Sequence, residues 1–204
     1  MMERSEQLKK YCQPQDIPKF LPLFEEIDKR LSQGKLIIAV EGGSASGKTT
    51  LGKIIEEIYG CTVFHTDDFF LRPEQRTPER YAEVGGNVDR ERFLEEVLLP
   101  LSEGKVISYR RFDCSEMKLQ NPIEIKPEKL TVIEGAYSMH PVFEKFYDFS
   151  VFLNISEDLQ RKRILKRNSP DKSERFFNEW IPLEKTYFSV TDVKKRCGMC
   201  IEIG

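Results

Sequence analysis

The sequence has no apolar run that approaches the ~20 residues a bilayer-spanning helix needs. The opening residues, MMERSEQLKKYCQPQD, are charged, and they lack the apolar stretch and the small-residue cleavage site of a signal peptide. The two absences exclude the membrane-spanning class of protein. They predict a cytoplasmic protein with no membrane partner.

An excess of charge of one sign is also missing. Lys and Arg number 32, Asp and Glu number 34, and the net charge at pH 7 is −2. Proteins that bind nucleic acid through their overall charge carry a basic excess, so we expect no nucleic-acid partner. Neither the composition nor any motif indicates an oligomeric state.

Cysteines are few, odd in number and scattered, at Cys12, Cys61, Cys114, Cys197 and Cys200. This distribution is typical of reduced thiols and not of a disulfide framework. Cys197 and Cys200 have CxxC spacing, but a zinc site needs a second pair or nearby histidines. We therefore expect neither metal nor redox chemistry from these thiols.

Apolar periodicity and turn residues alternate along the chain in the manner of an α/β domain, and 204 residues suit a single domain. Strands that alternate with helices form a doubly wound parallel sheet, which binds ligands beyond the carboxyl ends of its strands. The periodicity predicts helices at 19–33, 49–59, about 90–99 and 157–168, and strands at 36–40, 61–65, 105–109, 130–134 and 149–154.

Three segments stand apart from this alternation. Residues 1–34 form a helical N-terminal extension before the first strand, and residues 161–180 form a basic region that we interpret as a lid. Residues 72–92 are rich in charge, proline and glycine, with little apolar periodicity. We predict that residues 72–92 pass over the substrate site, with a merely solvated connection as the alternative.

A phosphate-binding loop lies between the first strand and the next helix. Residues 42–49, GGSASGKT, match G-x-x-x-x-G-K-[ST], and the strand before and helix after are the context this motif requires. The glycines permit a tight turn, Lys48 reaches the β and γ phosphates, and the Thr49 hydroxyl binds Mg²⁺. The predicted nucleotide-binding residues are Gly42, Gly43, Ser44, Ala45, Ser46, Gly47, Lys48, Thr49 and Thr50.

Two acidic positions follow apolar strands. Asp67 comes directly after the strand at 61–65 and is our candidate for the base that deprotonates an acceptor hydroxyl, with Asp68 as its competitor. Either aspartate could instead cap a turn. Glu134 ends the run LTVIE, where a carboxylate can hold Mg²⁺ directly or through water. The alternative for Glu134 is a surface residue at a strand end.

A basic cluster follows the last predicted strand. Arg163 and Arg167 stand four residues apart in a helix that Ser156 can cap, so they share a face, whereas Arg161 points elsewhere. A guanidinium that reaches the transferring phosphoryl group stabilises charge in the transition state. The alternative is a solvated charged helix.

Taken in order, these motifs resemble those of the uridine kinase family of P-loop kinases, whose relatives include phosphoribulokinase and bacterial pantothenate kinase. GGSASGKTT resembles the family's phosphate loop, HTDDFF its D-x-F signature, VIEGAYS its apolar strand followed by Glu-Gly, and RKRILKRN its arginine-rich lid. The resemblance implies a single kinase domain over residues 1–204. It also implies a P-loop NTPase fold with three α/β/α layers, a mainly parallel five-stranded sheet and a helical lid.

The resemblance further implies the roles of individual residues. Asp67 stands two residues before the aromatic Phe69, as the family's catalytic base does. The lid motif is matched less closely, with one extra residue between its two arginines. The predicted catalytic residues are Asp67, Lys48, Arg163 and Arg167, and the predicted Mg²⁺ ligands are Thr49, Asp67 and Glu134.

The acceptor pocket departs from that of the family's nucleoside kinases. Those carry a Tyr, an aromatic residue and a His after the third strand, whereas this chain reads YRRFDC from Tyr109 and lacks the His. Arg110 and Arg111 suit an anionic acceptor at least as well as a neutral base. His140 either contributes to the pocket or is structural. The predicted acceptor-binding residues are Asp68, Phe69, Asp89, Tyr109, Arg111, Tyr137 and His140.

The motifs together predict transfer of the γ-phosphoryl group of ATP to a hydroxyl of a small molecule, with ATP and Mg²⁺ as cofactors. Uridine or cytidine is the leading acceptor, and an anionic or phosphorylated metabolite is the alternative. An ATP-binding regulatory protein without an acceptor is the competing class. The guanine-reading N-K-x-D motif is missing, which argues against a GTPase switch.

Overall fold

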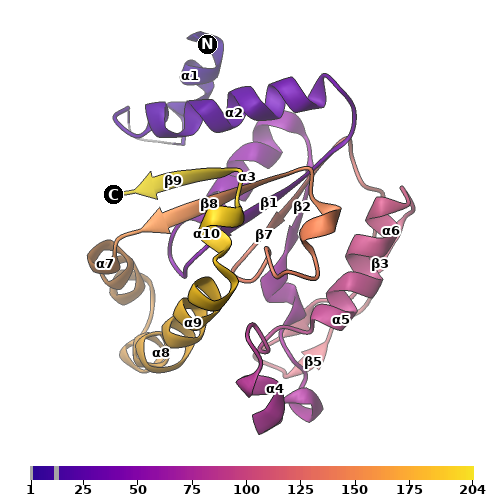
Figure 1. The fold of residues 1–204 in the computed structure, drawn as a ribbon, viewed down its shortest axis with the longest axis vertical. Helices are drawn as coiled ribbons and strands as arrows, with labels where there is room; N and C mark the ends of the chain where they lie inside the picture. Colours follow the sequence, from indigo (N-terminus) through magenta and orange to yellow (C-terminus); the bar gives the residue numbers. More distant parts are fainter. Residues whose placement is uncertain (1, 12–13) are drawn as a thin grey trace.

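The computed structural model of the chain describes residues 2–11 and 14–204 (Figure 1). Cys12 lies outside the described residues, and the other four cysteines are free thiols. Across the part of the chain that is described, none of the helices is both long and apolar enough to span a membrane. The strands are β1 (Leu36–Gly42), β2 (Thr62–His65), β3 (Ile107–Tyr109), β4 (Phe112–Asp113), β5 (Lys118–Leu119), β6 (Ile123–Ile125), β7 (Leu130–Glu134), β8 (Phe149–Ile155) and β9 (Met199–Ile203).

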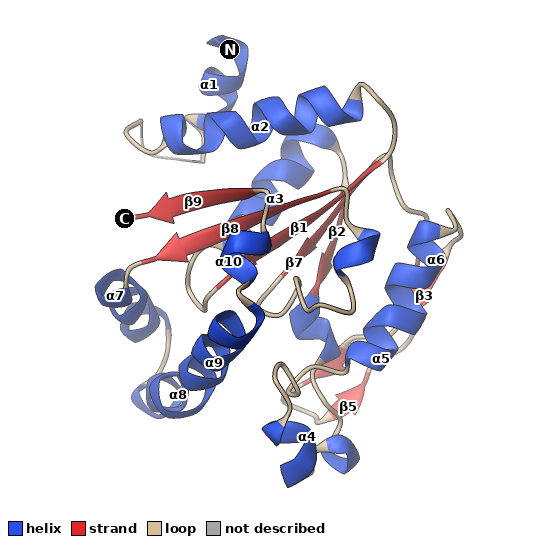
Figure 2. Cartoon of the chain, in the orientation of Figure 1, coloured by secondary structure: helices blue, strands red, loops and turns tan. Residues whose placement is uncertain are grey.

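Helices surround the strands (Figure 2). The α-helices are α1 (Met2–Leu8), α2 (Ile17–Leu31), α3 (Lys48–Tyr59), α4 (Pro78–Ala82), α5 (Arg90–Phe93), α6 (Leu99–Ser102), α7 (Glu157–Arg167), α8 (Pro170–Arg175), α9 (Ile181–Thr191) and α10 (Val193–Arg196). Shorter 3₁₀ segments are η1 (Thr66–Phe69), η2 (Pro73–Gln75) and η4 (Glu144–Phe146), and π-helical turns are η3 (Leu94–Leu98) and η5 (Phe176–Trp180).

Within the described residues, five parallel strands form the central sheet in the order β2-β7-β1-β8-β9. Strand β1 lies at the centre, where Ile38 is in register with Val132 of β7 and Val40 with Val151 of β8. The predicted parallel α/β fold is confirmed, and the strands predicted at 36–40, 61–65, 130–134 and 149–154 all belong to this sheet.

The predicted place of the strand at 105–109 is wrong. Strand β3 pairs antiparallel with β6 outside the central sheet, and the fifth strand of that sheet is β9, which the periodicity did not indicate. The physical reason is burial. Ser108 in β3 is exposed, which a strand covered on both faces does not permit. Edge strand β9 exposes Cys200 and Glu202, so it lacks the continuous apolar run of its neighbours.

Alternate residues of the strands supply two separate cores, one on each face of the sheet. On one face, Ile38 and Val132 pack with Leu23 and Ile27 of α2 and Ile55 of α3. The opposite face of the strands contributes to a second core with the helical stretch 90–102 and with α9 and α10. The fold is therefore the predicted three-layer α/β/α sandwich (Figure 2).

The helix predicted at about 90–99 and the helical stretch 170–191 each contain one π-helical turn. Residues 94–98 form the first, two residues before Pro100, and residues 176–180 form the second, two residues before Pro182. A proline lacks the N–H that would bond to the carbonyl four residues earlier, and its ring clashes with that carbonyl. The wider π turn relieves this clash, so both turns are encoded locally.

Candidate active site

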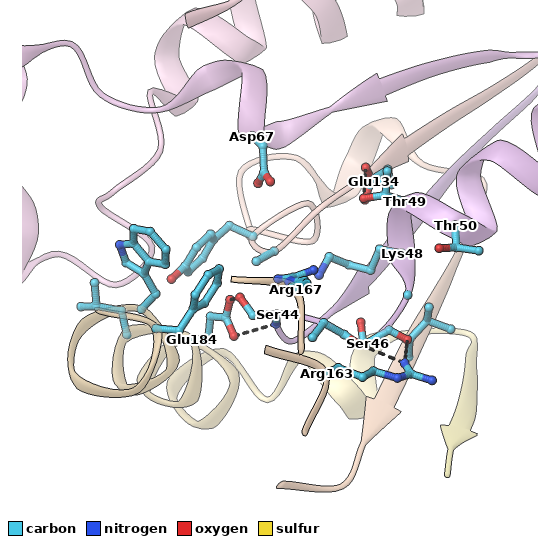
Figure 3. A pocket seen from close by; sticks show the side chains of 18 of the residues that line it. Ser44, Ser46, Lys48, Thr49, Thr50, Asp67, Glu134, Arg163, Arg167 and Glu184 are labelled. Carbon is cyan, nitrogen blue, oxygen red and sulfur yellow. Dashed lines mark hydrogen bonds between the residues drawn. The ribbon is translucent and has the colours of Figure 1, made fainter. Parts of the chain in front are cut away.

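A cleft of about 2300 Å³ opens at the carboxyl ends of the central strands, where doubly wound sheets bind ligands. Its walls come from the phosphate-binding loop, from the ends of β2 and β7, from α7 to α9, and from the N-terminal segment before and within α2. The labelled side chains of Figure 3 project into it from several of these elements. The cleft therefore brings together residues that are distant in the sequence.

The phosphate-binding loop leaves β1 and ends at the first turn of α3. Gly42 and Gly47 have positive φ angles of 149° and 105°, and a Cβ on Gly42 would lie 2.6 Å from the Leu153 carbonyl oxygen. Lys48 is buried and its ammonium donates a hydrogen bond to the Gly43 carbonyl at 2.9 Å. The loop thus has the conformation that only glycine permits at these two positions, with its N–H groups at the amino end of a helix.

A buried carboxylate lies beneath the loop. Glu41 accepts hydrogen bonds from the N–H groups of Gly42 at 2.8 Å and Met139 at 2.9 Å, and from the Tyr187 hydroxyl at 3.1 Å. Desolvation by complete burial raises its pKa to about 7, against the opposing effect of these hydrogen bonds. Glu41 ties the loop to α9 and to the segment after β7. No motif marks it in the sequence.

The predicted metal ligands Thr49 and Glu134 are in contact. The Thr49 hydroxyl donates a hydrogen bond to Glu134 Oε1 at 3.0 Å, and His65 Nδ1 bonds to the same oxygen. His65 and Glu134 are in register because β2 and β7 are neighbours in the sheet. A hydroxyl beside a carboxylate is the oxygen-rich environment that Mg²⁺ prefers, so these residues fit the cation.

Asp67 lies in η1, directly after β2, and is exposed to the cleft. Figure 3 shows its carboxylate pointing toward the space bounded by Lys48 and Glu134. Desolvation by the surrounding protein raises the pKa of Asp67, and the positive charge of Lys48 partly opposes that effect. A carboxyl group of raised pKa, free of ion-pair partners in the described residues, is suited to accept a proton.

The positions of Asp67 and Glu134 depend on a close approach of two backbones. Gly135 has φ 142°, and a Cβ there would lie 1.8 Å from the Thr66 hydroxyl oxygen. That hydroxyl donates a hydrogen bond to the Ala136 carbonyl at 3.0 Å. The Glu-Gly sequence after β7 therefore lets the end of β7 lie against the start of η1.

Helix α7, which lies in the segment predicted to be a lid, reaches the phosphate-binding loop through Arg163. Arg163 donates hydrogen bonds to the carbonyls of Ala45 at 3.0 Å and Ser46 at 3.4 Å. Arg167 also lines the cleft, and its guanidinium lies over the Phe176 ring, 5.3 Å from the centroid. The structure brings both predicted lid arginines to the cleft wall (Figure 3).

A second carboxylate that the sequence did not indicate binds the loop from α9. Glu184, only 4% exposed, accepts hydrogen bonds from the backbone N–H and the hydroxyl of Ser44. Gln160 of α7 donates to the Ser44 carbonyl at 2.8 Å. Burial raises the pKa of Glu184, and the charge of Lys48 lowers it in part. Its tertiary position alone reveals it, because Glu184 lies in no motif.

Tyr137 is the predicted acceptor-binding residue that lines the cleft. It has a left-handed backbone with φ 71°, which is rare for a residue other than glycine and is often found at functional sites. Its hydroxyl is buried and forms no well-aligned hydrogen bond among the described residues, and the Asn87 side chain is its polar neighbour. A polar group of a ligand in the cleft would complete its hydrogen bonding.

The other predicted acceptor-binding residues are not among those that line the cleft. Phe69 and Tyr109 are core residues, stacked with a centroid distance of 5.7 Å. Asp89 caps α5 by accepting from the Arg92 N–H at 3.2 Å. Asp68 and Arg111 form an ion pair with each other, at 3.3 Å. The last of the set is His140, and burial lowers its pKa to about 4.

Residues that the motifs did not indicate supply much of the acceptor side of the cleft. Arg76, Tyr81 and Asn87 come from the segment 72–92, and Trp180 comes from the π turn η5. Arg80 holds that segment in shape by bonding to the carbonyls of Gly86 and Val88 and by pairing with Glu91. The sequence predicted that residues 72–92 pass over the substrate site and that residues 161–180 form a lid, but without a motif or periodicity it did not indicate which of their side chains face the cleft.

The fold and the loop geometry define a P-loop protein of the α/β class. The sequence profile of the "Phosphoribulokinase / Uridine kinase family" matches residues 37–176, more than half of the chain. The chain therefore belongs to the phosphoribulokinase/uridine kinase family, and it is a P-loop kinase that acts on a small molecule.

Individual relatives agree with this membership. A uridine kinase of Ligilactobacillus salivarius is 27% identical over 150 residues, which is 69% of this chain and 68% of the relative. A uridine kinase of Staphylococcus aureus is 28% identical over 149 residues, or 68% of this chain and 70% of the relative. A possible uridine kinase structure from Bacillus stearothermophilus matches with TM-score 0.63 and 20% identity, over 89% of this chain and all of that one. The last likeness supports the fold alone.

Proposed function

We propose that the protein transfers the γ-phosphoryl group of ATP to a hydroxyl of a small molecule, with a nucleoside, uridine or cytidine, as the leading acceptor. The observation that carries the proposal is the placement of Asp67. It faces the cleft beside Lys48 and the Thr49–Glu134 pair, where a γ-phosphate would be bound. Uridine kinases among the relatives support the choice of acceptor.

The residues have separate tasks in this reaction. The N–H groups of the loop bind the phosphate oxygens, and Lys48 bridges the β and γ phosphates. The oxygen of the acceptor hydroxyl attacks the γ-phosphorus, and Asp67 accepts the proton of that hydroxyl. The bond between the γ-phosphorus and the oxygen that bridges the β and γ phosphates breaks, and ADP leaves with that oxygen. Arg163 and Arg167 stabilise the charge on the equatorial oxygens.

Thr49 and Glu134, with Asp67, would hold Mg²⁺, which when bound neutralises negative charge on the β and γ oxygens. The contact between the Thr49 hydroxyl and Glu134 supports this assignment. In this arrangement Glu134 remains a ligand and positioning group, and Asp67 remains the base. His65 orients Glu134 through its ring nitrogen.

An anionic acceptor is the second candidate. Arg110 and Arg111 no longer support it, because Arg110 lies 3.9 Å from Glu96 and Arg111 lies 3.3 Å from Asp68. Arg76 supports it instead, since this guanidinium lines the cleft from the segment after Asp67. A phosphate or carboxylate on the acceptor would find its charge partner there.

An acceptor panel measured by ADP release tests the proposal. Uridine and cytidine are compared with sugar phosphates and hydroxy acids, and Arg76→Ala is assayed beside the wild type. Turnover with nucleosides that survives Arg76→Ala supports the leading acceptor. Turnover with anionic acceptors alone, lost in Arg76→Ala, would replace it with the second candidate. ATP binding without turnover of any hydroxyl compound would favour a regulatory protein.

A further inference from the structure

The N-terminal part of the chain contributes a wall to the cleft although it lies outside the family match, which begins at residue 37. The side chains concerned, which we call the N-terminal wall, lie in the segment before α2 and in its first turn. They are Tyr11, Gln15, Asp16, Lys19 and Phe20. The cleft is continuous from these residues to the phosphate-binding loop.

Specific contacts fix the N-terminal wall in place. The Tyr11 hydroxyl donates a hydrogen bond to Glu57 of α3 at 2.5 Å. Lys19 donates to the Gly204 carbonyl at 2.8 Å and to Asp16 at 2.9 Å. The amino end of α2 and the carboxyl end of β9 accordingly lie at the same side of the molecule (Figure 1). The wall therefore bridges α3 and the end of β9.

The order of the strands decides which part of the nucleotide lies beside this wall. Asp67 follows β2, and Glu134 is the last residue of β7. Both strands lie on the same side of β1 in the sheet. The transferred phosphoryl group must face Asp67, so the other end of the triphosphate points toward β8 and β9. The cleft on that side is lined by Thr50, Ile54 and Ile203 together with the N-terminal wall.

We infer that the N-terminal wall forms the outer side of the pocket for the purine base of the donor nucleotide, with Lys19 as a specificity-determining residue. This inference rests on the proposed phosphoryl transfer from ATP. Ile54, Phe20 and Ile203 supply apolar surface for the faces of a flat ring. The Lys19 ammonium supplies a donor for a ring nitrogen, and the Gly204 carbonyl supplies an acceptor for an exocyclic amine.

The test compares ligands with and without a base. ATP and inorganic tripolyphosphate both fill the phosphate-binding loop, but tripolyphosphate has nothing to place against the wall. Calorimetric titration of Lys19→Ala should show the dissociation constant for ATP raised about tenfold, as for one lost charged hydrogen bond, with that for tripolyphosphate unchanged. Lys29→Ala is the matched control, because Lys29 is an exposed lysine of the same helix that pairs only with Glu26 among the described residues.

Three results would overturn the inference. If Lys19→Ala raised the dissociation constants for ATP and tripolyphosphate equally, Lys19 would act on the phosphate site or on stability. If ATP binding were unchanged, Lys19 would not belong to the base pocket. Wild-type protein that binds neither ligand would overturn the proposed function, and this inference with it. Photolabelling with 8-azido-ATP adds a readout without a substitution: the label should fall on a residue of the N-terminal wall, between Tyr11 and Phe20. Labelling confined to other parts of the chain would contradict the proposal.

Discussion

The carboxylate of Glu184 accepts hydrogen bonds from the backbone N–H of Ser44 at 2.9 Å and from its hydroxyl at 2.5 Å. The N–H groups of such loops bind phosphate oxygens, so a carboxylate of α9 occupies a donor that a nucleotide would use. Glu184 also lies beyond the family match, which ends at residue 176. A phosphate bound to this N–H would therefore compete with α9 for the same donor.

Replacing Glu184 by glutamine should tighten ATP binding by roughly three- to tenfold, because the negative charge beside the γ-phosphate site is removed while hydrogen bonding to Ser44 is kept. The gain should be smaller for ADP, which lacks the γ-phosphate. Burial raises the pKa of Glu184, so the difference between variant and wild type should shrink as the pH falls and the wild-type carboxyl becomes protonated. Calorimetric titration over pH 5 to 8 measures both effects.

The exposed Glu174→Gln is the control for this measurement, since Glu174 lies on α8 and its side chain contacts Asn178 instead of the loop. Weaker ATP binding by Glu184→Gln would contradict the prediction. It would indicate that the carboxylate supports the bound conformation of the loop.

Asp67→Asn should retain ATP binding and lose acceptor-dependent turnover by about 10²- to 10⁴-fold, the usual contribution of a general base. The pKa of Asp67 is raised, and only its deprotonated form accepts a proton. Wild-type kcat/KM, which reports the free enzyme, should therefore rise with pH through this raised pKa. The residual activity of the variant should lack that dependence.

Asp68→Asn distinguishes the two neighbouring aspartates. Asp68 pairs with Arg111 and does not line the cleft, so this variant should keep most of the turnover. Loss of turnover in Asp68→Asn with near wild-type activity in Asp67→Asn would assign the base to Asp68.

Glu41 should make the stability of the protein depend on pH. Its pKa rises from an ordinary 4.5 to about 7 on folding, so between these values the folded state binds more protons than the unfolded state. The free energy of unfolding should therefore fall as the pH rises through this window, by roughly 3 kcal/mol in all. Urea unfolding at several pH values measures the slope.

Glu41→Gln should remove this contribution, because an amide does not titrate. The surface variant Glu95→Gln should keep the wild-type profile. A Glu41→Gln profile parallel to that of the wild type would show that other groups cause the slope.

Gly135→Ala should lower the free energy of unfolding by roughly 2 to 5 kcal/mol, because the new methyl group overlaps the Thr66 hydroxyl and the φ angle disfavours a side chain. Gly34→Ala is the matched control. Gly34 also has a positive φ, of 157°, but a Cβ there meets nothing within 4 Å, so the loss should be about 1 kcal/mol. Equal losses in both variants would show that the contact with Thr66 is unimportant.

The parts of the site that were predictable from sequence are those with local causes. The phosphate-binding loop is a contiguous stretch of eight residues, and the backbone conformation of this stretch determines the roles of its glycines and of Lys48. Asp67 and Glu134 were predictable because each directly follows or ends an apolar strand, and parallel strands deliver their carboxyl ends to one edge. The α/β class follows from periodicity in the same way.

Tertiary structure alone decided the rest. Glu184 and Lys19 reach the loop or cleft from elements with no motif, and Glu41 precedes the phosphate-binding motif without being one of its positions. Pairing across more than a hundred residues, as between Ser44 and Glu184, leaves no pattern in the chain. The predicted acceptor residues Phe69 and Tyr109 lie in the core because aromatic side chains serve packing as well as recognition. The sequence by itself determined the phosphate-binding loop, the class of sheet and the edge of the sheet at which the cleft lies. Only the tertiary structure decided which strands are neighbours and therefore which residues form the walls of the cleft.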